Sequence, residues 1–201
     1  MTGRFEVLFV STGNVCRSPL AERIAEHDLD VALGDAAGAF RMSSAGTWGH
    51  DGASMEPHAR QMLMERGIRH TAFVARELLP EHLAVADLVL TGSAEQRHQV
   101  TLLDPHAVGR AFTLREFARL AAGLDTSDLP DAAPARARAL VARIAARREH
   151  VATLPVDDDI ADPYGAPLHV FRLCVEEISE CLSAFVGLLA ADRVGRLGAV
   201  G

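Results

Sequence analysis

The stretch V-L-F-V-S-T-G-N-V-C-R-S-P-L-A-E, residues 7–22, joins an apolar run, a tight connection and the start of a helix. The apolar run, residues 5–10, is typical of a buried parallel strand. Ser18 followed by Pro19 predicts an N-cap with proline at the first helical position, and the apolar residues beyond them supply one face of the helix. The stretch therefore predicts a strand, a loop over residues 11–17 and a helix in direct succession.

The rest of the chain repeats this alternation. The sequence predicts further strands at residues 40–45, 86–91 and 111–114, and helices at residues 55–66, 94–102, 115–122, 136–150 and 171–185. Strands that alternate with helices imply a parallel sheet covered on both faces. We expect an α/β fold, a single three-layer domain over residues 1–201 with a four-stranded, mostly parallel sheet and a flexible tail at residues 192–201.

Composition and charge limit the classes of function. The chain has 201 residues, 49% of them apolar, which suits one globular domain. Its net charge of −7 argues against a nucleic-acid partner. No apolar run approaches the roughly 18 residues that cross a bilayer, and the first ten residues do not resemble a signal peptide. We therefore expect a cytoplasmic protein that has neither a membrane nor a nucleic-acid partner.

The loop at residues 11–17 has the chemistry of an oxyanion site. Backbone N–H groups at a helix N-terminus converge on one point, where the helix dipole favours an anion. Gly13 permits close approach of a ligand, Asn14 tolerates left-handed backbone angles, and Arg17 offers a bidentate guanidinium. A nucleotide-binding loop of the lysine type is excluded because the chain contains no lysine. The simpler alternative is a strand–helix turn beside a surface arginine.

The same residues resemble the signature of the low-molecular-weight protein tyrosine phosphatases. That signature is a cysteine, five further residues, an arginine and a serine, placed between the first strand and the first helix. Residues 43–47, S-S-A-G-T, are similar to the second strand of the family and the loop after it. Residues 162–164, D-P-Y, are similar to the late loop that carries the general acid. The resemblance covers most of the chain but is weak over residues 105–155, a longer segment.

The resemblance implies hydrolysis of phosphate monoesters, foremost phosphotyrosine on proteins, through a cysteinyl-phosphate and without a cofactor or a metal. The nucleophile position is 11. Arg17 would hold the phosphoryl oxygens together with the loop, and Asp162 would protonate the leaving group and then activate water. The loop residues expected to bind the substrate are Thr12, Gly13, Asn14, Val15 and Cys16. The expected partner is a phosphorylated protein or a small phosphate ester, with phosphate or a similar oxyanion in the loop.

Three further side chains are assigned to the site by the resemblance. Ser18 would orient the nucleophile, cap the helix, or do both. Trp48 and Tyr164, the only tryptophan and tyrosine of the chain, would wall the pocket and stack on a phosphoaryl group. His50 is a weaker candidate for this rim. The neighbouring carboxylates at residues 157–159 are interpreted as a solvated charge run.

Position 11 departs from the family, because a serine stands where the catalytic cysteine belongs. An alcohol ionises far less readily than a thiol, and no histidine nearby in the sequence indicates a general base. We therefore expect an inactive or trapping protein that binds phosphate esters and turns them over poorly. Two accounts stay open: an engineered Cys→Ser replacement, and a native serine in a phosphate-binding relative.

Two other functions fit the same scaffold less well. An enzyme acting on a phosphorylated small molecule would prefer a free metabolite to a phosphotyrosyl peptide. Arsenate reductases share the fold but need resolving cysteines on a mobile segment. Cys174 and Cys181 fall instead on the apolar stripe of the last predicted helix, about 10.5 Å apart along its axis, which favours core packing.

Overall fold

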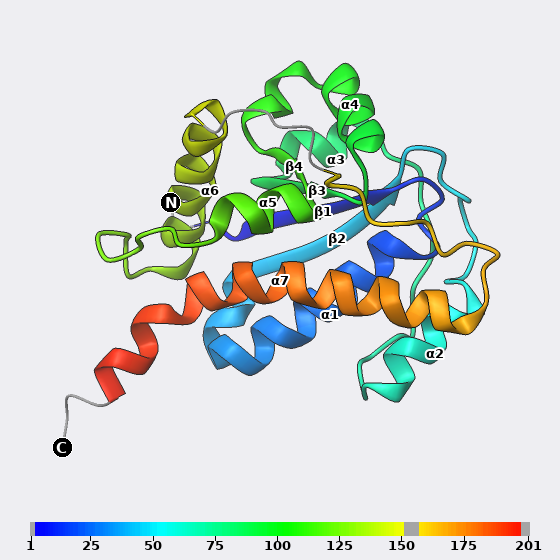
Figure 1. Ribbon diagram of the computed structural model, residues 1–201, viewed down its shortest axis with the longest axis horizontal. Coiled ribbons are helices and arrows are strands. Elements are labelled where there is room, and N and C mark those ends of the chain that lie inside the picture. Colours follow the sequence, from blue (N-terminus) through cyan, green and yellow to red (C-terminus); the bar gives the residue numbers. More distant parts are fainter. Residues whose placement is uncertain (1–2, 151–156, 198–201) are drawn as a thin grey trace.

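The computed structural model describes residues 3–150 and 157–197 (Figure 1). Four strands form one sheet in the order β2-β1-β3-β4: β1 (Phe5–Ser11), β2 (Phe40–Gly46), β3 (Leu88–Thr91) and β4 (Ala111–Thr113). The α-helices are α1 (Arg17–Leu33), α2 (Pro57–Glu65), α3 (Pro80–Val85), α4 (Ala94–Leu103), α5 (Leu114–Ala121), α6 (Ala133–His150) and α7 (Leu168–Leu197). Two short 3₁₀ helices are η1 (Gly34–Ala39) and η2 (Pro105–Gly109).

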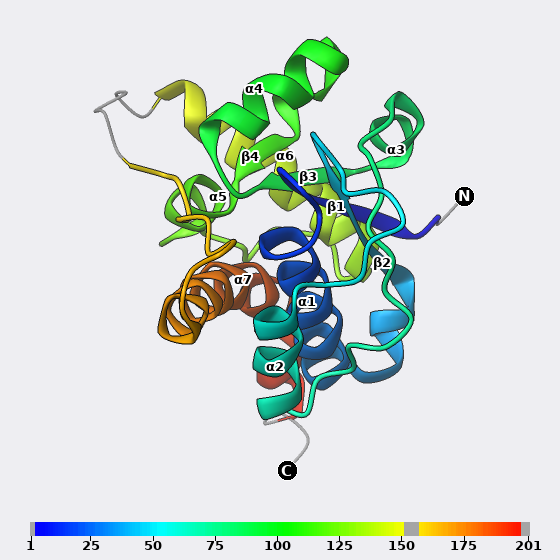
Figure 2. The same ribbon diagram turned by 90° about the vertical axis from the view of Figure 1, so that its right-hand side faces the viewer.

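The alternation of side chains along β1 creates two cores, one on each face of the sheet. Phe5, Val7 and Phe9 point into the larger core, which is filled by residues of α1, α5, α6 and α7. Leu8 and Val10 point into a smaller core shared with α3, α4 and η2. Figures 1 and 2 show α1 and α7 side by side on one face and α3 and α4 on the other. Because β1 is buried on both faces, its sequence is continuously apolar rather than alternating.

The predicted fold class is confirmed. Every strand pair is parallel, and helices cover both faces. Three short elements, η1, α3 and η2, were not predicted, because each is only one or two turns long and contributes a single buried side chain to the core: Ala37, Leu83 and Ala107 respectively. Helix α7 continues to Leu197, through most of the segment predicted as a flexible tail. Residues 198–201 of that segment lie outside the described residues.

The start of α1 corrects one prediction. The helix begins at Arg17, and its N-cap is Cys16, whose side chain makes no capping hydrogen bond. Ser18, predicted as the N-cap, is the second helical residue. Its hydroxyl hydrogen-bonds instead to Ser11 and Asn14. The helix therefore starts two residues, about half a turn, earlier than a serine cap would place it.

Helix α6 lies in the segment 105–155, and its arginines hydrogen-bond to other parts of the domain. Arg138 pairs with Asp87 and donates to the Arg4 carbonyl. Arg148 donates to the Ala111 carbonyl at the end of the sheet, and its guanidinium lies 3.8 Å from the centre of the Phe112 ring. These contacts fasten the segment to the domain. Residues 151–155 lie outside the described residues. No helix in the described part of the chain is long and apolar enough to cross a membrane.

Candidate active site

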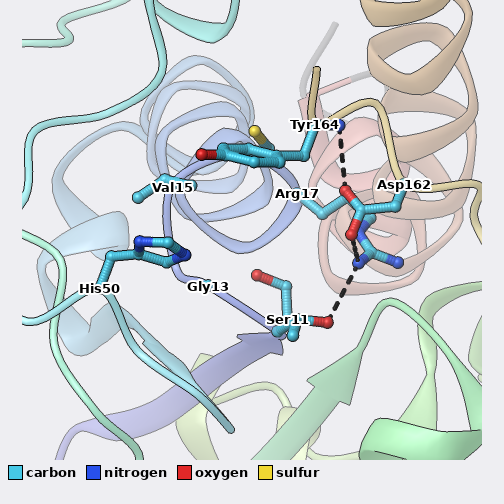
Figure 3. Close-up of a pocket in the computed structure, with 9 residues that line it drawn as sticks. Ser11, Gly13, Val15, Arg17, His50, Asp162 and Tyr164 are labelled. Carbon is cyan, nitrogen blue, oxygen red and sulfur yellow. Dashed lines mark hydrogen bonds and ion pairs between the residues drawn. The ribbon is translucent and has the colours of Figure 1, made fainter. Parts of the chain in front are cut away.

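A cavity of about 90 Å³ opens at the carboxyl end of β1 (Figure 3). It is lined by Ser11, Thr12, Gly13, Val15, Cys16, Arg17, His50, Asp162 and Tyr164. The chain runs from β1 to β2 on one side and then crosses to β3 on the other, so β1 is the point where the strand order reverses. In open α/β sheets this is where ligands bind. Nine residues from three segments of the chain therefore meet where the fold favours a ligand.

The backbone of residues 11–17 turns its carbonyl groups outward. The carbonyls of Ser11, Thr12 and Gly13 accept from the N–H groups of residues 47, 48 and 50, at 2.9 to 3.0 Å. The Val15 carbonyl accepts from residue 56 at 3.0 Å. No N–H group of residues 12–17 donates to an acceptor within the described residues. The loop thus keeps its donors for a ligand, which is the arrangement of an anion-binding site at a helix N-terminus.

Two glycines allow this close packing of loops. A Cβ at Gly46 would lie 2.5 Å from the Thr12 carbonyl oxygen and 2.9 Å from the Asn14 nitrogen. A Cβ at Gly13 would lie 2.7 Å from a carbon of the His50 ring. The atoms near Gly46 belong to the backbone, so the loop after β2 can pack this closely on residues 12–14 only with glycine at position 46. At Gly13 a side chain would displace the His50 ring from its present position.

Asn14 supports the loop from its buried side. It adopts a left-handed φ of 54° and is fully buried. Its Nδ2 donates to the hydroxyls of Ser18 and Ser44, both at 2.9 Å, and its Oδ1 accepts from the Arg76 N–H at 2.9 Å. Every polar atom of the side chain is therefore used. The Asn14 side chain thus shapes the loop, and the substrate-binding role predicted for Asn14 stays a prediction that falls to its backbone N–H.

Glu22 extends this network beneath the loop. Ser44 Oγ donates to Glu22 Oε2 at 2.5 Å. Burial raises the pKa of the Glu22 carboxyl, and the hydrogen bond from Ser44 lowers it in part. Ser44 and Glu22 were not predicted from the sequence. Ser44 lies on β2 and Glu22 on α1, and because both elements carry other polar residues, neither side chain stands out.

Arg17 is the buried cation of the cavity. Its Nη1 donates to the Ile160 carbonyl at 3.1 Å, and its Nη2 pairs with Asp162 Oδ2 at 2.5 Å and reaches Thr12 Oγ1 at 3.4 Å. Its side chain is 6% exposed. The buried Nε has no hydrogen-bond partner in the described residues. A donor left over in this position is one that an oxyanion could use.

Asp162 comes from the far end of the chain. The residues before it are fastened firmly: the Ile160 N–H donates to the Gly92 carbonyl at 2.8 Å, Asp158 pairs with Arg119, and Asp159 accepts from the Ala94 N–H. The Asp162 side chain itself is 46% exposed and lines the cavity. Asp158 is partly buried in its pair with Arg119, so the predicted solvated run at residues 157–159 is wrong for that residue, whereas Asp157 and Asp159 are exposed as predicted. The contacts of Asp158, Asp159 and Ile160 anchor the loop so that Asp162 meets Arg17.

The rim of the cavity is aromatic but differs from the predicted one. Tyr164 lines it, and its ring centre is 6.0 Å from that of His50 (Figure 3). Trp48 lies elsewhere, in a neighbouring groove of about 410 Å³ that also contains Gln96. Gln96 Nε2 donates to Thr12 Oγ1 at 3.1 Å. Trp48 and His50 are two residues apart in one loop, and sequence alone could not decide which of them faces the cavity.

Ser11 is buried, with 2% of its surface exposed. Its Oγ lies 2.7 Å from Ser18 Oγ. The arrangement offers an oxyanion cradle, a carboxyl group and a hydroxyl at the nucleophile position. His50 lines the same cavity, but within the described residues no imidazole is hydrogen-bonded to that hydroxyl to take its proton.

The three thiols are poor nucleophiles. Burial, and secondarily the charges of Glu56 and Asp162, raise the pKa of the Cys16 thiol far above its usual range. Burial raises the pKa of Cys174 to about 12 and that of Cys181 to about 11. Cys174 and Cys181 pack in the larger core, as their spacing indicated.

Similar proteins give this geometry a context. Residues 6–134 match the sequence profile of the family described as low molecular weight phosphotyrosine protein phosphatase. The chain is 25% identical to the protein-arginine-phosphatase of Geobacillus stearothermophilus, over 94% of this chain and 99% of that protein. It is 38% identical to the low molecular weight protein-tyrosine phosphatase A of Mycobacterium tuberculosis, over 58% of this chain and 69% of that protein.

One solved structure covers almost the whole fold. It is a cysteine-to-serine mutant of the YwlE arginine phosphatase with a phosphorylated active-site serine. Its TM-score is 0.68 at 24% identity, over 94% of this chain and 99% of that one. Asp162 lies beyond the residues that match the family profile, so its place at the cavity is seen in the structure alone.

Proposed function

Since this chain belongs to the low molecular weight phosphotyrosine protein phosphatase family, we propose that it binds phosphorylated proteins in the cavity at residues 11–17. The observation that carries this proposal is the convergence of unused donors. The N–H groups of residues 12–17 and the buried Nε of Arg17 surround one cavity and have no acceptor within the described residues. A phosphoryl group presents three acceptor oxygens, which such a set of donors fits.

The chemistry of this lineage follows from the positions around the cavity. With a thiolate at position 11, attack on phosphorus would expel the alcohol or phenol, while Arg17 and the loop amides hold the charge on the phosphoryl oxygens. Arg17 would exchange Asp162 for the phosphoryl group. Asp162, released from that pair, would protonate the leaving oxygen and then activate the water that hydrolyses the phosphoenzyme.

Ser11 blocks multiple turnover in this proposal. No imidazole of the described residues is hydrogen-bonded to its hydroxyl, so it attacks slowly, and an alkoxide is a poor leaving group in the second step. As given, the chain acts as an impaired or trapping form of a phosphatase. The alternative is a native phosphate-ester binding module, which would use the same donors without the chemistry. The cytoplasm stays the predicted compartment.

The rim favours phosphotyrosine over phosphoarginine. Val15, His50 and Tyr164 offer apolar and aromatic surface, which suits a flat phenyl ring. A guanidinium would need carboxylates, and the lining of the cavity offers one, Asp162, which the mechanism assigns to the leaving group. Phosphoarginine is nevertheless the second candidate, because the relative matched over most of both chains is a protein-arginine-phosphatase.

The test compares hydrolysis of p-nitrophenyl phosphate by this chain and by its Ser11→Cys variant. We expect turnover from the variant only. Adding Asp162→Asn should lower that turnover by about 10²- to 10⁴-fold, the usual contribution of a general acid. Asp128→Asn is the matched control, because Asp128 is exposed, pairs with Arg143 on α6 and does not line the cavity. It should leave turnover within about twofold of the Ser11→Cys parent.

Three outcomes separate the candidates. No turnover by Ser11→Cys, in a protein that inorganic phosphate still stabilises, rejects the phosphatase chemistry and leaves the binding module. Turnover that Asp162→Asn does not change removes Asp162 from the mechanism. Turnover of a phosphoarginine peptide in preference to a phosphotyrosine peptide replaces the first candidate substrate with the second.

A further inference from the structure

A second pocket, of about 280 Å³, lies apart from the cavity at residues 11–17 and shares no lining residue with it. It is bounded by α1, by the edge strand β2 and by the segment 72–76, which lies between α2 and α3 in the chain. Its charged lining consists of three arginines, Arg23, Arg41 and Arg76, and one carboxylate, Glu22. The pocket therefore has an excess of positive charge, which favours an anion.

The carboxylate of Glu22 does not cancel this excess. Its Oε2 accepts from the Ser44 hydroxyl, and its Oε1 lies 3.6 Å from Arg23 Nη2. Burial raises the pKa of the Glu22 carboxyl, which disfavours its negative charge. Arg41 and Arg76 form no ion pair with it among the described residues. Two of the three guanidinium groups therefore have no carboxylate partner inside the pocket.

All three arginines have donors left over. Arg76 Nε donates to the Ser44 carbonyl at 2.8 Å, but its two terminal nitrogens donate no hydrogen bond within the described residues. Arg41 Nε lies 3.8 Å from Glu6, which is too far for a hydrogen bond. The Nε of Arg23 is buried and has no partner in the part of the chain that the structure describes. Such donors suit the oxygens of a phosphate, which guanidinium groups bind through pairs of hydrogen bonds.

The pocket is held in shape by hydrogen bonds that do not involve a ligand. The Arg76 N–H donates to Asn14 Oδ1 at 2.9 Å, and the Arg76 carbonyl accepts from the Gly46 N–H at 3.0 Å. Ser44 Oγ accepts from Asn14 Nδ2 at 2.9 Å. The backbone that carries Arg76 is therefore fixed beside β2 before any ligand arrives, which lowers the entropic cost of binding.

From these observations we propose that this pocket, the arginine pocket, is a second anion site that binds a small phosphate compound. The ligand is inorganic phosphate or a phosphate monoester, since both present the same oxygens to Arg23, Arg41 and Arg76. Phe73 and Val74 also line the pocket and offer apolar surface to the organic part of an ester. The site is separate from the cavity, so its occupancy does not depend on chemistry at residue 11.

Equilibrium dialysis with radiolabelled inorganic phosphate counts the ions bound per chain. We expect two in the parent chain, one in the cavity and one in the arginine pocket. Arg76→Gln should weaken one of the two binding events on the order of tenfold to a hundredfold. Arg41→Gln should weaken the same event about three- to tenfold, because its side chain is 64% exposed. Arg172→Gln is the matched control and should change neither event, since Arg172 is an exposed arginine of α7 that pairs with Glu65 and lines neither pocket.

Arg17→Ala separates the two sites, because it removes the buried cation of the cavity and touches no residue that lines the arginine pocket. One binding event should remain in this variant. Phenyl phosphate that binds there more tightly than inorganic phosphate identifies the ligand as an ester, and equal affinities identify it as free phosphate. Urea unfolding shows whether the variant is folded. If it is not, the Arg76→Gln and Arg41→Gln variants of the parent chain decide.

The outcomes distinguish this inference from the proposed function. A single bound phosphate that Arg17→Ala removes and Arg76→Gln leaves means that the arginine pocket binds nothing, so the inference is wrong while the proposed function stands. A single bound phosphate with the opposite response supports the arginine pocket and counts against the cavity. Two bound phosphates that neither Arg76→Gln nor Arg41→Gln weakens place the second ion elsewhere and overturn the inference. A chain that binds no phosphate overturns both.

Discussion

The floor and the rim of the cavity are built in opposite ways. The floor, residues 11–17, is buried except at Thr12 and Gly13, and the side chains of Ser11, Asn14 and Arg17 hydrogen-bond to the surrounding fold. The rim side chains Trp48 and Tyr164 are 79% and 60% exposed. Tyr164 lines the cavity together with residues of the floor. Trp48 lines the neighbouring groove instead.

This difference separates two tasks. A phosphoryl group is the same on every substrate, so the groups that bind it can be fixed by the packing of the domain. The residue that carries the phosphoryl group differs between substrates. The side chains that would recognise it are exposed to solvent, where substitution changes the stability of the fold little. Substitutions in the floor should therefore change chemistry and stability together, whereas those in the rim should change substrate preference alone.

The largest effect is expected at Arg17. In the Ser11→Cys background, Arg17→Lys keeps the charge but loses the planar fork that holds Ile160, Asp162 and an oxyanion at once. We expect kcat/KM for p-nitrophenyl phosphate to fall by about 10²- to 10³-fold. Arg23→Lys is the matched control, since Arg23 lies on the same helix and outside the cavity. An Arg17→Lys variant as active as this control would show that charge alone suffices and that the geometry of the floor is dispensable.

A smaller effect, on stability rather than rate, is expected at Asn14. Asn14→Ala removes three buried hydrogen bonds and puts a Cβ-bearing residue at a φ of 54° without the local hydrogen bonds that asparagine makes there. The free energy of unfolding should fall by about 2 to 4 kcal/mol. Asn14→Gly loses the same hydrogen bonds without the backbone strain, so it should be about 1 kcal/mol less harmful.

Urea unfolding of both Asn14 variants and of Trp48→Ala tests the contrast between floor and rim. The Trp48 variant should stay within about 0.5 kcal/mol of the parent, as exposed substitutions usually do. Equal stability of the Asn14 and Trp48 variants would mean that the floor is not held by its hydrogen bonds.

The floor was also the part that the sequence could predict. Its residues are consecutive, so a single stretch reports the strand, the glycine, the arginine and the helix start, and the strand–loop–helix order fixes their place at the end of the sheet. The mistake at Ser18 was one of detail. A serine before a proline is a good N-cap by local rules, but the tertiary bonds to Ser11 and Asn14 take precedence over capping.

The rest of the site is formed by residues that lie far apart in the sequence. Ser44, Glu22 and Gln96 support the loop from three different elements, and no spacing rule links them. Asp162 could be named only through its resemblance to a known loop. Its position follows from anchors such as Ile160 and Asp158, whose partners lie far away along the chain. The exposed rim residues follow no periodic pattern in the sequence. The sequence therefore could not show that His50, and not Trp48, lines the cavity.

The smallest effect separates the two rim aromatics. Tyr164→Ala, in the Ser11→Cys background, should raise KM for a phosphotyrosine peptide about two- to tenfold, the value of one aromatic stacking contact, and leave kcat for p-nitrophenyl phosphate nearly unchanged. Trp48→Ala should raise the same KM by less than about twofold, because Trp48 does not line the cavity. If Trp48→Ala has the larger effect, the peptide lies across the groove beside Gln96 and Trp48, and the rim that selects the substrate is wider than the cavity itself. If Tyr164→Ala lowers kcat as strongly as Asp162→Asn, the aromatic ring positions the acid, and the division between floor and rim fails at that residue.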